Sequence, residues 1–319
     1  MFNPSKKQLM AVYLIAFILA LLYIFSLTLF SSDNKKRHSQ QLQLLHQADI
    51  SNIDIITFQR QNQSVILLRR DNMWQLVNPL NADDRLVANA DTLQKFFICL
   101  ANNHTLIKAG KIDSKDEAWS SSSYGFNQQD ATMITLYKNG LEYQKLLFGS
   151  LNFSQTERYF TTNELNAVYL AGQEFEPFLS LTIQNWVDPY IISSQLKDSV
   201  FTMGQVQTVN FYDYQEQKAC LLDSLNAEDK SRIDKLLELR HGGFVEDQTF
   251  SPSESQKYLN LQLQMGDKSK INLDFYKSQT AENEYITEVS FDSQRQGKSF
   301  KYKTNISSWT YNKIKEMML

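Results

Sequence analysis

The sequence is poor in the residues on which many functional sites depend. Its 319 residues include only 10 glycines, 5 prolines, 4 histidines and 2 cysteines. Neither a Walker loop nor a Gly-x-Gly-x-x-Gly motif occurs, so a nucleotide-binding loop is not expected. The histidines are too scattered for a His-x-x-x-His pair, and Cys-x-x-Cys is absent. We therefore expect no metal site and no cofactor.

The sequence also has no strong excess of positive or negative charge. The formal net charge is -3, and the lysines and arginines form no basic stripe, which argues against a nucleic-acid partner. Cys99 and Cys220 form at most one disulfide, so the cysteines do not identify a compartment. A hydrophobic content of 42% indicates a folded chain, and its length suffices for two domains, or one domain and an anchor.

One long hydrophobic run is present near the N-terminus. Residues 9–30, LMAVYLIAFILALLYIFSLTLF, carry no charge, and as a helix they would span roughly 33 Å, enough to cross a bilayer core of about 30 Å. No small-x-small cleavage site follows, so we expect an uncleaved anchor in the lipid bilayer rather than the alternative, a cleaved signal peptide. Lysines and arginines flank both ends, so the positive-inside rule does not fix the orientation. This divides the N-terminal part into a tail (1–8), a single transmembrane anchor (9–30) and a polar stalk (31–52).

The most organised stretch is RRDNMWQLVNPLNADDRLVANADTLQKFF, residues 69–97. An alternating run contains Trp74, and Pro79 stops it. Asp83 or Asp84 then stands where a helix N-cap is expected, which we favour over a catalytic or metal role for the pair. Trp74 is predicted to pack under that helix. The helical prediction rests on apolar residues in steps of four, three, four and three, at Leu86, Ala90, Leu93, Phe97 and Leu100.

Hairpin and helix signals then alternate through the chain. Asn139-Gly140 marks a two-residue hairpin turn, and a helix is predicted over 174–185. In the second half, Asn226 is the expected N-cap of a helix that ends at Gly242. Hairpins and a closing helix follow, so strands–helix–hairpin–hairpin–helix occurs twice at an offset of about 140 residues. We expect an α+β fold in which two similar domains of antiparallel hairpins with packed helices, 53–200 and 201–319, follow the anchor.

A resemblance to a known family rests on motifs in a fixed order. NMWQLVNPLNADDRLVANADTLQKFFICL is followed by YGF at 124–126, LLFG at 146–149, RYF at 158–160 and AVYL at 167–170. Together these motifs resemble the domain-of-unknown-function family 4340, over roughly residues 53–215, with Phe126 and Phe148 where that family has Leu and Ile. The resemblance implies a single-pass protein of the cytoplasmic (inner) membrane whose bulk faces the periplasm or extracytoplasmic side. It also implies an auxiliary role beside gliding-motility-type ABC transport components, and it supplies no catalytic residues.

No reaction can be derived from the remaining motifs, and no catalytic residue is predicted. His241-Gly242-Gly243 lacks the Gly-x-Ser-x-Gly elbow that an oxyanion loop requires, and Cys99 is expected to be buried. We therefore expect a non-enzymatic, membrane-anchored accessory or scaffold protein with membrane or envelope protein partners. The alternative is an extracytoplasmic ligand-binding or hydrolytic domain acting on envelope glycan or peptide. Its candidate site is a cleft between the two domains, which join near residues 190–205. The serine loop 120–123 between Trp119 and Tyr124 is a further place for a sugar, although we favour a simple connection there.

Overall fold

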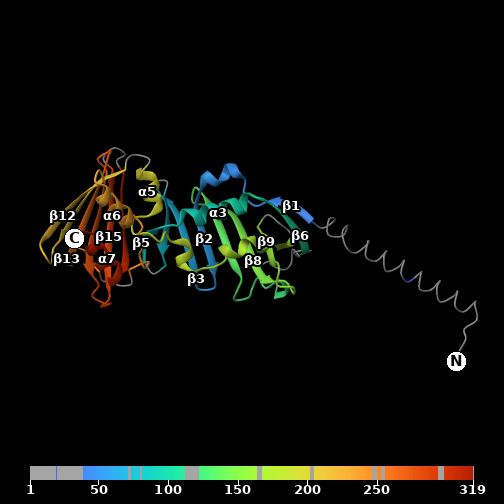
Figure 1. Ribbon diagram of the computed structural model, residues 1–319. Coiled ribbons are helices and arrows are strands. Elements are labelled where there is room, and N and C mark those ends of the chain that lie inside the picture. The colour runs from blue at the N-terminus through green and yellow to red at the C-terminus, as the bar shows by residue number, and fades with distance from the viewer. Residues whose placement is uncertain are drawn as a thin grey trace, which may run out of the picture.

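Two antiparallel β-sheets lie end to end in the computed structural model and give the molecule an elongated shape (Figure 1). The structure describes residues 19, 39–70, 73–79, 81–111, 122–163, 167–201, 205–245, 250–252, 256–293 and 298–318.

The first sheet has ten strands in the order β1-β6-β10-β9-β8-β7-β2-β3-β4-β5. All the pairings in it are antiparallel. Its strands are β1 (Ser39–Gln43), β2 (Ile53–Arg60), β3 (Gln63–Arg70), β4 (Met73–Asn78), β5 (Asn81–Val87), β6 (Asn103–Lys111), β7 (Thr132–Lys138), β8 (Leu141–Leu151), β9 (Arg158–Thr162) and β10 (Ala167–Ala171).

The second sheet has six strands in the order β12-β11-β13-β14-β15-β16, again all antiparallel. These are β11 (Val206–Asp213), β12 (Lys218–Asp223), β13 (Lys257–Met265), β14 (Lys270–Lys277), β15 (Glu284–Ser293) and β16 (Lys298–Ser307). The helical segments are η1 (Gln47–Asn52), α3 (Ala90–Ala101), η3 (Ser122–Tyr124), η4 (Gln173–Phe178), α4 (Ile183–Trp186), α5 (Ser194–Phe201), α6 (Ala227–Leu237) and α7 (Ser308–Met318).

Alternation of apolar and polar residues places these strands. In β13, KYLNLQLQM, every second residue from Leu259 to Met265 is fully buried, and the residues between them are half-buried, because successive side chains point to opposite faces. The predicted hairpin turn between β7 and β8 is confirmed: Asn139 and Gly140 have φ of 54° and 73°, the left-handed region that this turn requires.

Six of the ten strands in the first sheet are connected in the same order as the six strands of the second sheet. In the first sheet the hairpin β2–β3 joins the four-stranded meander β7–β10 through pairing of β2 with β7. In the second, the hairpin β11–β12 joins the meander β13–β16 through pairing of β11 with β13. In both halves a helix, α3 or α6, separates hairpin and meander along the chain. The first sheet is wider because β4 and β5 extend one edge and β6 and β1 extend the other.

The helices of the first half cover one face of the first sheet. Phe58 of β2 contacts Phe96 of α3 and Trp186 of α4, with ring centroids 5.4 and 4.3 Å apart. Phe148 of β8 contacts Phe175 of η4 at 5.2 Å. All five rings are almost completely buried, so this face holds the main core of the first half.

The second sheet is covered in the same way by α6 and α7. Tyr311 of α7 stacks on Tyr285 of β15 at 3.8 Å and contacts Phe275 of β14 at 6.3 Å. Ile233 and Leu236 of α6 are buried. The prediction of a helix capped by Asn226 is confirmed, because the Asn226 side chain accepts hydrogen bonds from the first-turn N–H groups.

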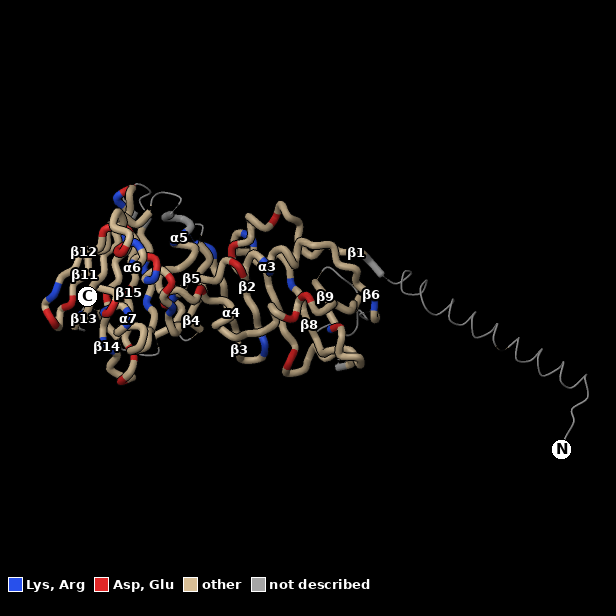
Figure 2. Tube along the Cα trace, viewed as in Figure 1, with Lys and Arg blue, Asp and Glu red and all other residues tan. Residues whose placement is uncertain are grey.

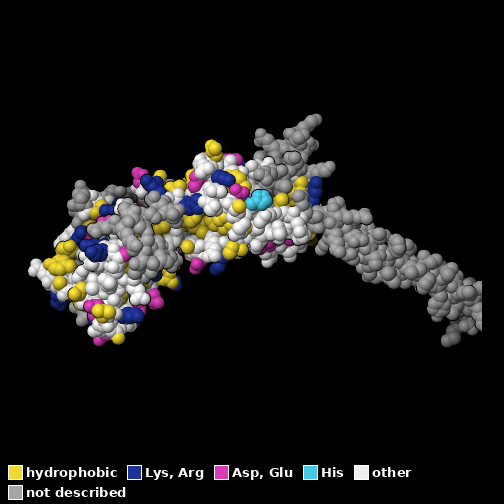
Figure 3. All heavy atoms as spheres, turned by 90° about the horizontal axis from the view of Figure 1, so that it is seen from above, with side chains coloured by type: hydrophobic (Ala, Val, Ile, Leu, Met, Phe, Trp, Pro, Cys, Tyr) yellow, Lys and Arg dark blue, Asp and Glu magenta, His cyan; other side chains and the backbone are white. Residues whose placement is uncertain are grey.

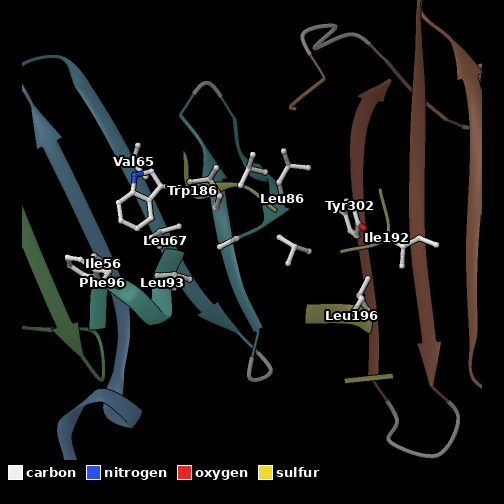
Figure 4. Packing of buried hydrophobic residues seen from close by; sticks show 14 of the residues in the cluster. Ile56, Val65, Leu67, Leu86, Leu93, Phe96, Trp186, Ile192, Leu196 and Tyr302 are labelled. Carbon is white, nitrogen blue, oxygen red and sulfur yellow. The ribbon is translucent and has the colours of Figure 1, made fainter. Parts of the chain in front are cut away.

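The segment between α4 and α5 joins the two halves. Val187 bridges to Ala88 beside the first sheet, and Tyr190 bridges to Arg240 in the second half. Figure 4 shows side chains from both sides meeting at this junction, among them Leu86, Ile192, Leu196 and Tyr302. Each is at most 4% exposed, so one hydrophobic core continues from the first sheet into the second.

The predicted α+β fold class is wrong. The described part of the chain is mostly β, with 51% strand, and two antiparallel sheets form its framework. One reason is that the structure contains less helix than the sequence predicts. The helix expected over 174–185 is instead the 3₁₀ segment η4, which contains Pro177, followed by the four-residue α4.

Within the described residues, no helix is long and apolar enough to cross a membrane. The predicted anchor, residues 9–30, lies outside the described residues except for Leu19. The predicted stalk is partly corrected. Residues 39–43 form the edge strand β1, paired with β6, and Leu44 and Leu45 are buried in the core.

Candidate functional site

The acidic pair singled out in the sequence does not cap a helix. Asp83 and Asp84 lie in strand β5, and α3 begins six residues later with Asn89 as its N-cap, whose side chain accepts a hydrogen bond from Thr92 N–H. Asp84 accepts a hydrogen bond from Asn78 at 3.0 Å. Burial raises the pKa of Asp84, and the hydrogen bond from Asn78 opposes this shift. The pair therefore belongs to a β4–β5 hairpin, and Pro79 lies in its turn.

Trp74 packs against α3 as the sequence predicts, and it also lines an open groove. Its ring centroid lies 5.8 Å from that of Phe97, and the side chain is only partly buried. The groove has a volume of about 570 Å³. Its apolar lining includes Ile50, Trp74, Leu93, Phe97 and Ile98, which come from η1, β4 and α3.

The groove lies toward the middle of the molecule. The element η1 and helix α3 lie along the upper side in Figure 1, and Gln195 of α5 adds the wall nearest the second sheet. In the view from above, hydrophobic side chains gather over this middle part (Figure 3). Ile98 is 49% exposed, so the apolar surface of α3 extends out of the groove.

One cation stands at the groove. The guanidinium carbon of Arg69 lies 5.8 Å from the Trp74 ring centroid, and its Nη2 donates to the Ser51 carbonyl. Among the ion pairs of the described residues, none includes Arg69. A guanidinium carries five N–H donors, so Arg69 retains donors for a carboxylate or carbonyl brought by a ligand.

The amides at the groove have two roles. Gln195 fixes the wall: its Oε1 accepts from Trp74 N–H at 3.0 Å, and its Nε2 donates to the Ala88 carbonyl at 2.6 Å. Gln47 and Gln94 are exposed at the rim. Exposed amides donate and accept hydrogen bonds, so this rim suits a ligand with both kinds of group, such as a peptide backbone.

Acid–base groups are absent from the described lining of the groove, and its one hydroxyl, Ser51, has no carboxylate or imidazole beside it in that lining. None of the eleven residues that line it is Asp, Glu, His, Cys, Lys or Tyr. Over the described part of the chain, no group of three or more His, Cys, Asp and Glu side chains is placed to hold a metal ion. Lys, Arg, Asp and Glu residues are interspersed along the chain rather than gathered by sign (Figure 2).

His241 contacts the segment between the two halves, and the glycines after it pair with Asn305 of β16 instead of ending α6. The helix ends at Leu237 with Glu238 as its C-cap, so the predicted stop at Gly242 is wrong. His241 Nε2 donates to the Asp188 carbonyl at 2.7 Å, and its Nδ1 accepts from Gly243 N–H at 2.9 Å. Burial lowers the pKa of His241 and outweighs the opposing effect of Asp188, so this ring is held neutral.

The cysteines are free, and Cys99 is buried as predicted. Burial, together with the charge of Glu174, raises the pKa of the Cys99 thiol to about 12, so it is not a reactive thiolate near neutral pH. Cys220 lies half-buried in β12, in the other sheet. Of the predicted serine loop, Trp119, Ser120 and Ser121 lie outside the described residues.

No family model, no characterised protein and no solved structure matches the chain. The resemblance to family 4340 therefore stays a prediction from the motifs alone. The groove itself was missed by sequence reasoning, because its residues are spread from 47 to 195. The one available signal was Ile98, an apolar residue next to the predicted buried position 97 on a solvent-facing side of α3.

Proposed function

We propose that this protein is a non-enzymatic accessory protein held at the cytoplasmic membrane by residues 9–30, and that its extracytoplasmic part docks a partner polypeptide in the groove beside α3. The groove carries the proposal: an apolar floor of Trp74, Leu93 and Phe97 meets a polar rim and one arginine, Arg69, that pairs with no carboxylate among the described residues. Exposed apolar surface rimmed by polar residues is typical of interaction sites.

The open shape of the groove favours a polypeptide over a small molecule. Small-molecule pockets bury roughly 70–90% of their ligand, which an open groove does not achieve. A protein partner inserts one or two apolar side chains and excludes water with the surface around them. Ile98, half-exposed at the mouth, extends the apolar surface that such a partner would cover.

The chemistry of the lining indicates what the partner segment carries. An aliphatic or aromatic anchor fits between Trp74 and Phe97, and a carboxylate next to it pairs with Arg69. The alternative, an enzyme or binder acting on envelope glycan, requires convergent carboxylates in a cleft. The groove lining contains none, and this favours docking.

Two substitutions test the docking site. Ile98→Lys places a charge on the apolar mouth, and Arg69→Gln removes the cation, so we expect each to reduce recovery of a co-purifying partner at least tenfold. The measurement is quantitative mass spectrometry after purification of the cross-linked full-length protein from its native membrane. Leu141→Lys is the matched control, because Leu141 is 74% exposed and lies outside the groove.

The same variants identify a wrong assignment. Unchanged recovery of every partner in both Ile98→Lys and Arg69→Gln would remove the groove from the docking site. Turnover of an envelope glycan or peptide by the purified protein would instead favour the alternative function. Thermal melts of the three variants show whether a loss of binding reflects a loss of folding.

A further inference from the structure

The strand β12 forms the outer edge of the second sheet, at the end of the molecule opposite β1 (Figure 1). No described strand pairs with its outer side. Four of its six residues, Lys218, Ala219, Leu221 and Asp223, are exposed, and Leu221 is 59% exposed. An edge with free N–H and C=O groups and an exposed leucine is a template for pairing with another strand.

The free backbone groups of this edge can be assigned. Ser224 N–H donates to the Gln207 carbonyl of the neighbouring chain segment, at 2.9 Å, so residue 224 faces β11. Along an antiparallel strand, the backbone N–H and C=O groups of successive residues point alternately to the two sides of the strand. The N–H and C=O groups of residues 219, 221 and 223 therefore point outward, away from β11. Asp223 is already capped, since its N–H donates to Asp229 and its carbonyl accepts from Asn226 N–H. Among the described residues, the outward N–H and C=O groups of Ala219 and Leu221 are therefore left without a partner.

We propose that β12 pairs antiparallel with β12 of a second copy about a two-fold axis at Cys220. A two-fold axis perpendicular to the sheet leaves the α6-covered faces of both copies on the same side. Residues that lie opposite each other are then both odd-numbered or both even-numbered. In the register centred on Cys220, Ala219 of each copy lies opposite Leu221 of the other. The four free N–H groups and four free carbonyls then satisfy one another, without using those of Asp223.

The side chains are self-complementary in this register. Ala219, Leu221 and Tyr212 share the face directed away from α6, where a depression of about 390 Å³ is lined by all three. Leu221 of the second copy lies opposite the small Ala219 and beside that depression. Lys218 lies opposite Leu222, and Asp223 opposite Gln217, so no like charges oppose each other.

The register places the two Cys220 residues opposite each other. A non-hydrogen-bonded antiparallel pair has Cα atoms about 4.5 Å apart, within the range that a disulfide spans. The pairing of two short strands covers less area than the roughly 1,200–2,000 Å² of a stable interface, so the dimer is weak and depends on concentration. None of the residues that line the α3 groove belongs to β12, so the dimer does not rest on the proposed docking function.

Oxidative cross-linking of the full-length protein in detergent tests the dimer. Cu(II)-phenanthroline removes two electrons from the two thiols, two protons leave, and one S–S bond forms. Because the chain has only Cys99, which is buried, and Cys220, the expected product is a covalent dimer that Cys220→Ser abolishes. Leu221→Lys is expected to reduce its initial rate at least tenfold, and Leu141→Lys to leave it unchanged.

A second variant shows whether a reduced cross-linking rate reflects lost pairing or lost folding. Ala219→Pro removes an outward N–H that β11 does not use, and proline is tolerated on edge strands, so it should preserve the melt and still reduce the rate tenfold. The proposal is overturned if Cys220 forms no dimer at any concentration. It is also overturned if cross-linking proceeds equally fast in Leu221→Lys and Ala219→Pro, since random collision would then explain it.

Discussion

Replacing Trp186 by alanine is expected to destabilise the protein by about 3–5 kcal/mol, the largest effect of any single substitution considered. Trp186 is completely buried and contacts Phe58 and Phe96, at 4.3 and 6.0 Å between ring centroids. Its Nε1 donates to the Ser180 carbonyl at 3.1 Å, and alanine leaves that carbonyl without this donor. The variant therefore loses the free energy of burying the indole ring, the ring's packing contacts and one hydrogen bond, all at one place in the core.

Denaturant unfolding at constant temperature measures this loss as a lower midpoint. Trp309→Ala is the matched control, because Trp309 is 68% exposed on α7, and we expect its unfolding free energy to change by no more than ~0.5 kcal/mol. Equal midpoints for the two variants would contradict the placement of Trp186 at the centre of the first core.

Replacing Lys315 by alanine is expected to cost about 2–3 kcal/mol at neutral pH, through a buried carboxylate. Asp213 is only 2% exposed at the end of β11, and Lys315 Nζ of α7 lies 2.7 Å from its Oδ2. Burial alone would raise the pKa of Asp213, but the hydrogen bonds from Lys315 and from the N–H groups of Gln215 and Glu216 outweigh it and lower the pKa. The substitution removes the only cation in that set.

The pH dependence of this effect follows from the sign of the shift. A carboxyl whose pKa is lower in the folded protein stabilises it above the unfolded pKa, and this contribution is lost as the pH falls through the folded pKa. In Lys315→Ala the buried Asp213 loses its cation, so its folded-state pKa is higher than in the wild type. The stability difference between the two proteins should therefore be full at pH 7 and shrink as the pH falls, because Asp213 of the variant is protonated first. Unfolding curves from pH 3 to pH 7 measure it, and a constant difference over that range would contradict the ion pair.

Much of the fold follows from local signals in the sequence. The alternation in β13 and β14, the Asn139-Gly140 turn and the Asn226 cap are strong because each depends on neighbouring residues alone. The helix α3 was predicted with the right apolar face and the wrong start. Leu86 lies one helical step from Ala90 by coincidence, and its side chain fills the core from strand β5.

The remaining features depend on long-range pairing. Strands β1 (SQQLQ) and β5 (NADDRLV) have few β-branched or aromatic residues, so their sequences do not indicate strands. Their hydrogen bonds to β6 and β4 outweigh this weak propensity. The groove likewise depends on hydrogen bonds that join Gln195 to Trp74 and Ala88, which lie more than one hundred residues earlier in the chain. A pattern of neighbouring residues cannot predict such a contact.

The central claim is that the groove beside α3 holds a partner polypeptide, and site-specific photo-cross-linking tests it most directly. A photoreactive amino acid at position 98 is compared in the native membrane with the same amino acid at position 141, a second exposed leucine or isoleucine position outside the groove. We predict that position 98 captures one protein at a defined peptide that includes a carboxylate, that Arg69→Gln reduces this capture, and that position 141 does not yield it. Capture of the same proteins from both positions, or of glycan alone from position 98, would contradict the account.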